Sequence, residues 1–310
     1  ICAGSLLGIA LHGGTSFPVG KVEFMKLFPM SFREFLTATG KEQYVELLEQ
    51  KDHQMISSFK QIYIDALKEY YYVGGMPEAV LSYSQAHDLE DVRNIQNMIL
   101  AAYEQDFSKH APVSIVPKIR MVWNSIPSQL AKENRKFIYG LLRKGARAKD
   151  YETAIMWLID CGLIHKVSRI TTPNLPLKAY EDLKAFKLYL VDIGLLGALA
   201  GLKQSALLDG NGMFVEFKGA LTEQYVLQQL VTDPDIGIYY YTNDRGNCEI
   251  DFLIDDGNKV IPLEVKAELN LKAKSLKTYR EKYSPEVAVR TSMADYKEND
   301  GLVDMPLYMM

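Results

Sequence analysis

The stretch from Cys248 to Lys266 constrains the fold more than any other part of the chain. Apolar and polar residues alternate with a period of two in residues 249–254 and again in 259–266. The sequence Asp-Asp-Gly-Asn at 255–258 lies between these segments and has the composition of a tight turn. The pattern predicts two neighbouring antiparallel strands joined as a hairpin.

The same alternation predicts which side chains share a face of this hairpin. In the first strand, the apolar residues at 250, 252 and 254 are expected on one face, which leaves Asp251 on the opposite face. In the second strand, residues 261, 263 and 265 are apolar, and Glu264 and Lys266 fall on the other face. Pairing the two strands therefore brings Asp251, Glu264 and Lys266 within reach of one another.

Two carboxylates and a lysine in this arrangement suit metal-dependent hydrolysis. Carboxylates that lie a few ångströms apart repel each other, and a cation between them lowers the free energy of burying both. Oxygen ligands of this kind prefer Mg²⁺ or Mn²⁺, so we expect Asp251 and Glu264 to be metal ligands. Lys266 is expected to orient an attacking water or to hold a phosphate.

A third carboxylate, Glu223, is expected on a helix that precedes the hairpin. Ala220, Glu223, Leu227 and Leu230 are spaced by three, four and three residues, so Glu223 interrupts an apolar helix face. A carboxylate on such a face needs a partner, and a metal ion is one candidate. A Glu-x-Lys pair on a strand is also common as an exposed ion pair, so the prediction depends on the order of the segments.

Asp251 followed by Glu264-x-Lys266, with Glu223 on a preceding helix, resembles the core of the PD-(D/E)xK, or restriction-endonuclease-like, nuclease superfamily. The resemblance implies an α/β fold with a mixed sheet flanked by helices. It also implies that these four residues are catalytic and that they hydrolyse phosphodiester bonds with Mg²⁺ or Mn²⁺. Because superfamily members without catalytic activity exist, the same fold is compatible with a non-enzymatic module.

Composition and charge limit the classes of function. The chain has 310 residues, enough for two or three domains, and an ordinary hydrophobic content of 48%. Its three cysteines show neither disulfide nor zinc-site spacing, which favours a reducing cytoplasm. The net charge of −4 argues against general affinity for polyanions, so nucleic-acid contacts must come from local patches. No apolar run reaches the length of a transmembrane helix, and we expect no membrane association.

Two basic segments are candidates for contacts with nucleic acid. Residues 132–149 hold seven Lys or Arg residues and one Glu. Residues 272–282 hold five Lys or Arg residues and one Glu, on a predicted helix beside the carboxylate strands. Either segment would attract a phosphate backbone. The basic residues of the first segment could equally form a solvated helix face or pair with acidic residues of this chain. The second segment is also compatible with an ordinary surface helix. The predicted contact residues are Arg143, Lys144, Arg147, Lys272, Lys274, Lys277 and Arg280.

The N-terminal half of the chain is predicted to be mainly helical. A Ser-x-x-Glu capping box begins a helix at Ser31, the sequence Gly-Gly-Met-Pro at 74–77 interrupts the helical pattern, and helices resume at Pro77 and Leu89. Residues 112–180 contain amphipathic segments, a helix that stops at Gly162 and an alternating strand. Helices followed by a short hairpin indicate a winged-helix-like unit.

The order of several motifs resembles the latter part of a family of prokaryotic AAA-type ATP-binding proteins that carry a C-terminal domain of unknown function. The motifs are Gly4-Ser5, residues 27–36, residues 74–78, Asp106, residues 186–195 and residues 305–308. The resemblance implies three units: an ATPase remnant with a helical lid at 1–110, a winged-helix-like unit and connector at 111–202, and a PD-(D/E)xK domain at 203–310. It also implies homo-oligomers or protein partners.

The resemblance implies ATP binding only for a full-length protein. Relatives carry Walker A and Walker B strands before the segment that corresponds to Gly4-Ser5. Residues 13–22 depart from a phosphate loop, because the glycine spacing is one residue too long and Val22 stands where Ser or Thr would contact Mg²⁺. The expected function is therefore metal-dependent hydrolysis of nucleic acid. The alternative is a non-catalytic nucleic-acid or protein interaction module regulated by the absent ATPase half.

Overall fold

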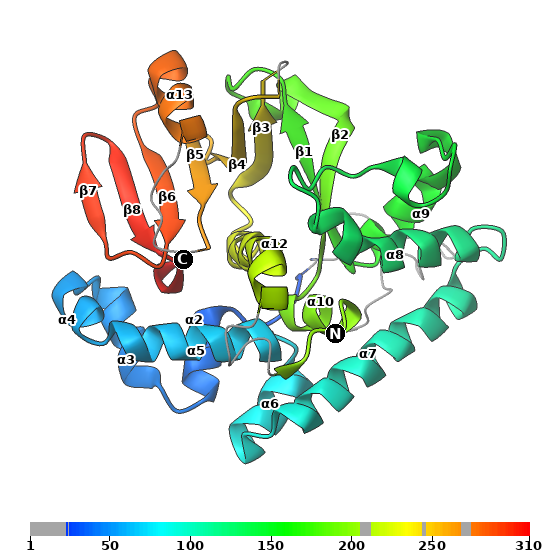
Figure 1. Ribbon diagram of the computed structural model, residues 1–310, viewed down its shortest axis with the longest axis horizontal. Helices are drawn as coiled ribbons and strands as arrows, with labels where there is room; N and C mark the ends of the chain where they lie inside the picture. Colours follow the sequence, from blue (N-terminus) through cyan, green and yellow to red (C-terminus); the bar gives the residue numbers. More distant parts are fainter. Residues whose placement is uncertain (1–22, 24, 205–211, 244–245, 268–273) are drawn as a thin grey trace.

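The computed structural model describes residues 23, 25–204, 212–243, 246–267 and 274–310. Within these ranges the chain forms eleven α-helices and one eight-stranded mixed sheet (Figure 1). The predicted α/β class is confirmed. Ser5, the glycine-rich segment 13–22 and Lys272 lie outside the described residues, so the predictions for them stay predictions.

The N-terminal part is helical, as predicted. Its helices are α2 (Phe32–Ala38), α3 (Glu42–Gln50), α4 (His53–Ser58), α5 (Lys60–Val73), α6 (Pro77–Ala86) and α7 (Leu89–His110). The capping box that begins α2 is confirmed, because the Ser31 N–H donates to Glu34 at 2.6 Å and the Ser31 hydroxyl accepts from the Glu34 N–H at 3.3 Å. Proline at the first turn of α6 starts that helix where its missing N–H is not needed.

The middle of the chain alternates helices and strands. Its elements are α8 (Val116–Leu130), a short 3₁₀ turn η1 (Tyr139–Leu141), α9 (Ala148–Asp160), β1 (Ile164–Ile170), η2 (Leu177–Tyr180), β2 (Glu181–Leu190) and α10 (Ile193–Leu199). The C-terminal part adds α12 (Gly212–Leu230), β3 (Gly237–Thr242), β4 (Glu249–Asp255), β5 (Val260–Val265), α13 (Lys274–Tyr283), β6 (Ala288–Ser292), β7 (Lys297–Asn299), β8 (Leu302–Pro306) and η3 (Leu307–Met309).

One sheet joins the middle and C-terminal parts in the order β2-β1-β3-β4-β5-β6-β8-β7 (Figure 1). The predicted strand after Gly162 is β1, which pairs antiparallel with β2 and also in parallel with β3, where Arg169 lies opposite Tyr240. The β1–β2 pair is therefore continuous with the strands that carry Asp251 and Glu264. The division into three units at residues 110 and 202 stays a prediction.

Two apolar clusters cover the two faces of the central strands. Phe252 packs with residues of α12 in the first cluster, whereas its neighbour Leu253 packs with Leu276 and Tyr279 of α13 in the second. Because successive side chains on a strand point to opposite faces, α12 and α13 lie on opposite sides of the sheet. Figure 1 shows α12 between the sheet and the N-terminal helices.

Glutamine side chains hold α12 in the centre of the molecule. Gln224 pairs with the backbone of Leu190 in both directions, at 2.9 Å and 2.7 Å. Gln228 accepts from the N–H of Ile193 at 2.8 Å. All of these groups are buried, where an unsatisfied hydrogen-bonding group is costly, so the contacts specify the position of α12. Since Glu223 belongs to the same helix, these contacts also fix the position of its backbone relative to the sheet.

Candidate functional site

The hairpin that the sequence predicted at 249–266 is confirmed. Strands β4 and β5 pair antiparallel, and the ladder runs from Asp255 opposite Val260 to Phe252 opposite Leu263. Beyond that point the Asp251 Oδ2 atom accepts a hydrogen bond from the Val265 N–H at 2.8 Å. The side chain of Asp251 thus takes the place of a main-chain acceptor at the end of the ladder.

The predicted alternation within β4 is wrong at one position. Ile250 packs in the second apolar cluster, whereas Phe252 and Ile254 pack in the first. The pairing of β3 with β4 shifts register between Tyr239 and Tyr241, so one extra β4 residue is accommodated there. A bulge of this kind changes the phase of the side chains, which a strict period of two cannot anticipate.

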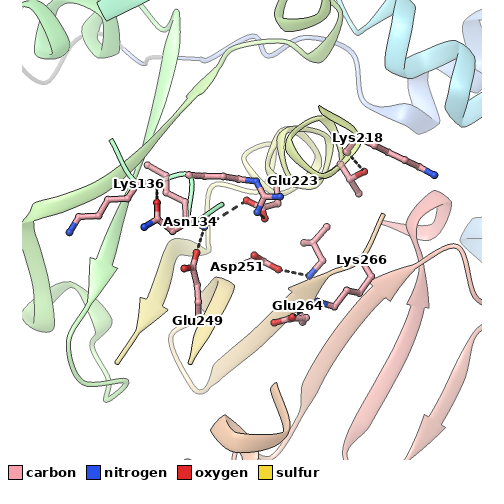
Figure 2. Close-up of polar contacts among 12 residues, drawn as sticks. Asn134, Lys136, Lys218, Glu223, Glu249, Asp251, Glu264 and Lys266 are labelled. Carbon is pink, nitrogen blue, oxygen red and sulfur yellow. Dashed lines mark hydrogen bonds and ion pairs between the residues drawn. The ribbon is translucent and has the colours of Figure 1, made fainter. Parts of the chain in front are cut away.

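Asp251 lies at this bulge, between Glu223 of α12 and Glu264 of β5 (Figure 2). It shares a side-chain hydrogen bond with Glu223. Desolvation, together with repulsion from Glu223 and Glu264, raises the pKa of Asp251 well above its usual range. The direction of these shifts favours a proton on Asp251 over one on Glu223.

Glu223 forms ion pairs with two cationic side chains of the same chain. Its carboxylate pairs with the Arg135 guanidinium, lies 3.7 Å from Lys187 Nζ, and accepts from the Tyr189 hydroxyl at 2.9 Å. Burial disfavours the charged form, but Arg135 and Lys187 outweigh burial and lower the pKa of Glu223. The partner that the sequence required for this buried carboxylate is thus supplied by arginine and lysine.

Lys187 is completely buried in β2, and its Nζ lies 2.8 Å from Glu249 Oε1 and 4.9 Å from the centre of the Tyr240 ring. Sequence reasoning did not single out Lys187, Tyr189 or Glu249 as site residues. A signal was present, because a lysine stands inside the otherwise apolar run 185–191 of a strand. A charge at such a position needs an internal partner.

Glu264 and Lys266 form the second half of the site. The Lys266 ammonium donates to Glu264 Oε1 at 2.7 Å, and the Lys266 N–H donates to the Thr291 carbonyl at 2.8 Å. Glu264 is 5% exposed, and its Oε2 atom is buried with no hydrogen-bond partner among the described residues. Burial raises the pKa of Glu264, and Lys266 opposes that rise.

The residues present fit one magnesium-like ion with few protein ligands. Within the described part of the chain, no group of three or more His, Cys, Asp or Glu side chains is arranged to hold a metal. Mg²⁺, however, is often bound by one or two carboxylates together with waters and substrate phosphate. Asp251 and the unpartnered Oε2 of Glu264 match that requirement.

The charges of the site balance when one carboxyl group is protonated. Its members are Glu223, Glu249, Asp251 and Glu264, and the cations Arg135, Lys187 and Lys266. With a proton on Asp251, three negative charges face three positive charges. This arrangement explains how so many ionisable groups are accommodated in the interior.

The predicted nucleic-acid contacts lie at the surface. Arg143, Lys144 and Arg147 are exposed in the segment between η1 and α9. Lys274 and Lys277 are exposed on α13. These roles stay predictions.

The remaining described member of this set, Arg280, donates to the Asp300 carbonyl. Helix α13 packs against β4 and β5, as expected, but on the side of the sheet opposite to α12 and Glu223. From the basic segment 132–149, Arg135 is brought into the carboxylate site.

Two family models match the chain. Residues 64–206 match a domain of unknown function, DUF8612, and residues 218–310 match another domain of unknown function, DUF4143. The second range contains all four predicted catalytic residues, and the first contains Arg135 and Lys187. No curated protein and no solved structure matches the chain. The helices that the structure describes include none with the length and apolarity needed to cross a bilayer.

Proposed function

We propose that the chain is the nuclease-like part of an AAA-type ATP-binding protein and that it hydrolyses phosphodiester bonds of nucleic acid with Mg²⁺ or Mn²⁺. The observation that carries the proposal is the position of Asp251 and of the Glu264–Lys266 pair at the end of the β4–β5 ladder, where Asp251 and Glu264 repel each other and Glu264 Oε2 is buried with no hydrogen-bond partner among the described residues. The match at 218–310 supports it, because that domain often occurs with AAA ATPases. ATP binding belongs to this proposal only for a full-length protein.

Each side chain has a distinct role in this proposal. Asp251 and Glu264 would hold the ion, which would polarise a phosphoryl oxygen and lower the pKa of a bound water. Asp251 binds a cation only as a carboxylate, so it must first release its proton. Lys266, which donates to Glu264, would contact a phosphate oxygen or the attacking water. Glu223 orients Asp251 through their shared hydrogen bond.

A second candidate function is a non-catalytic module that binds nucleic acid or a protein partner, with regulation by the ATPase part. The pairing of the carboxylates within the chain favours it. Glu223 pairs with Arg135 and Lys187, Glu249 pairs with Lys187, and Glu264 pairs with Lys266. Asp251 accepts from a backbone N–H. A cluster paired in this way needs no metal for its stability.

Calorimetric titration with Mn²⁺, followed by incubation with DNA and RNA, separates the two candidates. We expect the parent protein and Asp235→Ala, which removes an exposed carboxylate before β3, to bind Mn²⁺ and to cleave nucleic acid. Asp251→Ala is expected to lose both properties, and Lys266→Met to retain binding but lose cleavage. Metal-independent binding of nucleic acid without cleavage would favour the second candidate.

A further inference from the structure

The ammonium group of Lys187 lies where a metal ion held by carboxylates would lie. Its Nζ is 2.8 Å from Glu249 Oε1 and 3.7 Å from Glu223 Oε2, and the side chain has no exposed surface. We propose that Lys187 is a built-in cation of the carboxylate site. It leaves room for a single divalent ion, at Asp251 and Glu264, and its removal creates a second divalent-cation site between Glu223 and Glu249.

The surroundings of Lys187 keep it charged and in place. Burial alone would favour the neutral amine, but Glu223 and Glu249 outweigh burial and raise the pKa of Lys187. The Tyr240 ring lies under the ammonium, which adds a cation–π contact. A fixed positive charge between two carboxylates performs the neutralisation that a metal ion would otherwise provide.

Arg135 closes the other side of Glu223. The loop that carries Arg135 is anchored by the Phe137 N–H, which donates to the Phe186 carbonyl of β2 at 2.9 Å. The guanidinium reaches α12 at Gly219, where an added Cβ would lie 2.7 Å from Arg135 Nη2. Glu223 is therefore shared between two cations.

Glu249 differs from Glu223 in its access to solvent. Its side chain is 26% exposed and forms an ion pair with Lys187. An ion that replaced Lys187 would therefore have a route from solvent past Glu249.

The four carboxyl groups thus divide into two pairs. Lys187 lies between Glu223 and Glu249, and Arg135 also pairs with Glu223, whereas among the described residues no such cation lies between Asp251 and Oε2 of Glu264. In this inference, the second pair is the one that takes a divalent ion in the parent protein. The statement about that first ion rests on the proposed function, but the creation of a second site by removal of Lys187 does not.

The test is the number of Mn²⁺ ions bound per chain, measured by calorimetry and by electron paramagnetic resonance of free Mn²⁺. We expect one ion for the parent and two for Lys187→Met, which removes the charge and keeps the length of the side chain. Lys184→Met is the matched control, because Lys184 is exposed on the same strand, and should bind one. The double variant Lys187→Met/Glu249→Gln should also return to one, because the new site loses a ligand.

Each outcome separates this inference from the proposed function. A folded Lys187→Met protein that binds no more Mn²⁺ than the parent would overturn the inference. If that variant does not fold in metal-free buffer, recovery of its circular dichroism on addition of excess Mn²⁺ supports the inference, and lack of recovery overturns it. A parent that binds no Mn²⁺ would refute the metal-dependent function alone. In that case, one Mn²⁺ ion bound by Lys187→Met and none by the parent would still support the second site.

Discussion

The ion pair between Arg135 and Glu223 joins residues 88 positions apart in the sequence, and its loss should lower the free energy of unfolding of the protein. Removing one partner of a buried ion pair destabilises a protein by about 3–5 kcal/mol, because the other charge stays buried without compensation. Glu223 is 2% exposed but keeps the Tyr189 hydroxyl at 2.9 Å and Lys187 at 3.7 Å. For Arg135→Met we therefore expect a loss of stability at the lower end of this range, about 3 kcal/mol.

A double-mutant cycle isolates the interaction. Urea unfolding of Arg135→Met, Glu223→Gln and the double variant, followed by circular dichroism in metal-free buffer, should give a coupling free energy of about 2 kcal/mol. Lys132→Met is the control, because Lys132 is exposed near the start of the same loop, and it should change stability by less than about 0.5 kcal/mol. A coupling free energy below about 0.5 kcal/mol would refute the reasoning, since that value is typical of an exposed ion pair.

The pH dependence of the same variants gives the sign of the effect. Arg135 and Lys187 overcome the effect of burial and lower the pKa of Glu223 from 4.5 to about 2. A group with a depressed pKa in the folded state stabilises the fold above its unfolded pKa, and that contribution is lost as pH falls through the folded pKa. The stability difference between the parent and Arg135→Met should therefore be largest above pH 4.5 and should shrink as pH falls toward about 2.

Three further predictions concern other parts of the molecule. Because Asp251 has a raised pKa in the folded state, the parent should lose stability as pH rises through that pKa, whereas Asp251→Asn, measured by urea unfolding at several pH values, should not. Asp192→Ala should lower the unfolding free energy by about 1–3 kcal/mol, because this buried carboxylate accepts from the Gly75 N–H at 2.6 Å and from Gln228 at 3.0 Å, and the buried donors would lose their partner. Replacing the exposed Lys274 and Lys277 by alanine should reduce the slope of log K against log salt for DNA binding by about 2, with unchanged circular dichroism.

Local patterns in the sequence were sufficient for the elements that carry the site. The hairpin at 249–266 followed from alternation and turn composition, and the start of α2 from the Ser31–Glu34 capping box. The burial of Glu223 followed from its place in an apolar helix stripe. Each of these features depends on residues that are near neighbours in the chain, and near neighbours interact in few ways.

The tertiary structure decided which charges meet. The bulge in β4 arises from its pairing with β3, and the parallel pairing of β1 with β3 brings the β1–β2 hairpin, and with it Lys187, beside the carboxylates. Arg135 reaches Glu223 from a loop in a distant segment. The sequence by itself determined that a buried carboxylate at 223 required a partner, for which a metal ion was one candidate. That the partners are Arg135 and Lys187 depended on long-range packing, because burial and proximity, rather than residue type, set the energy of each charge.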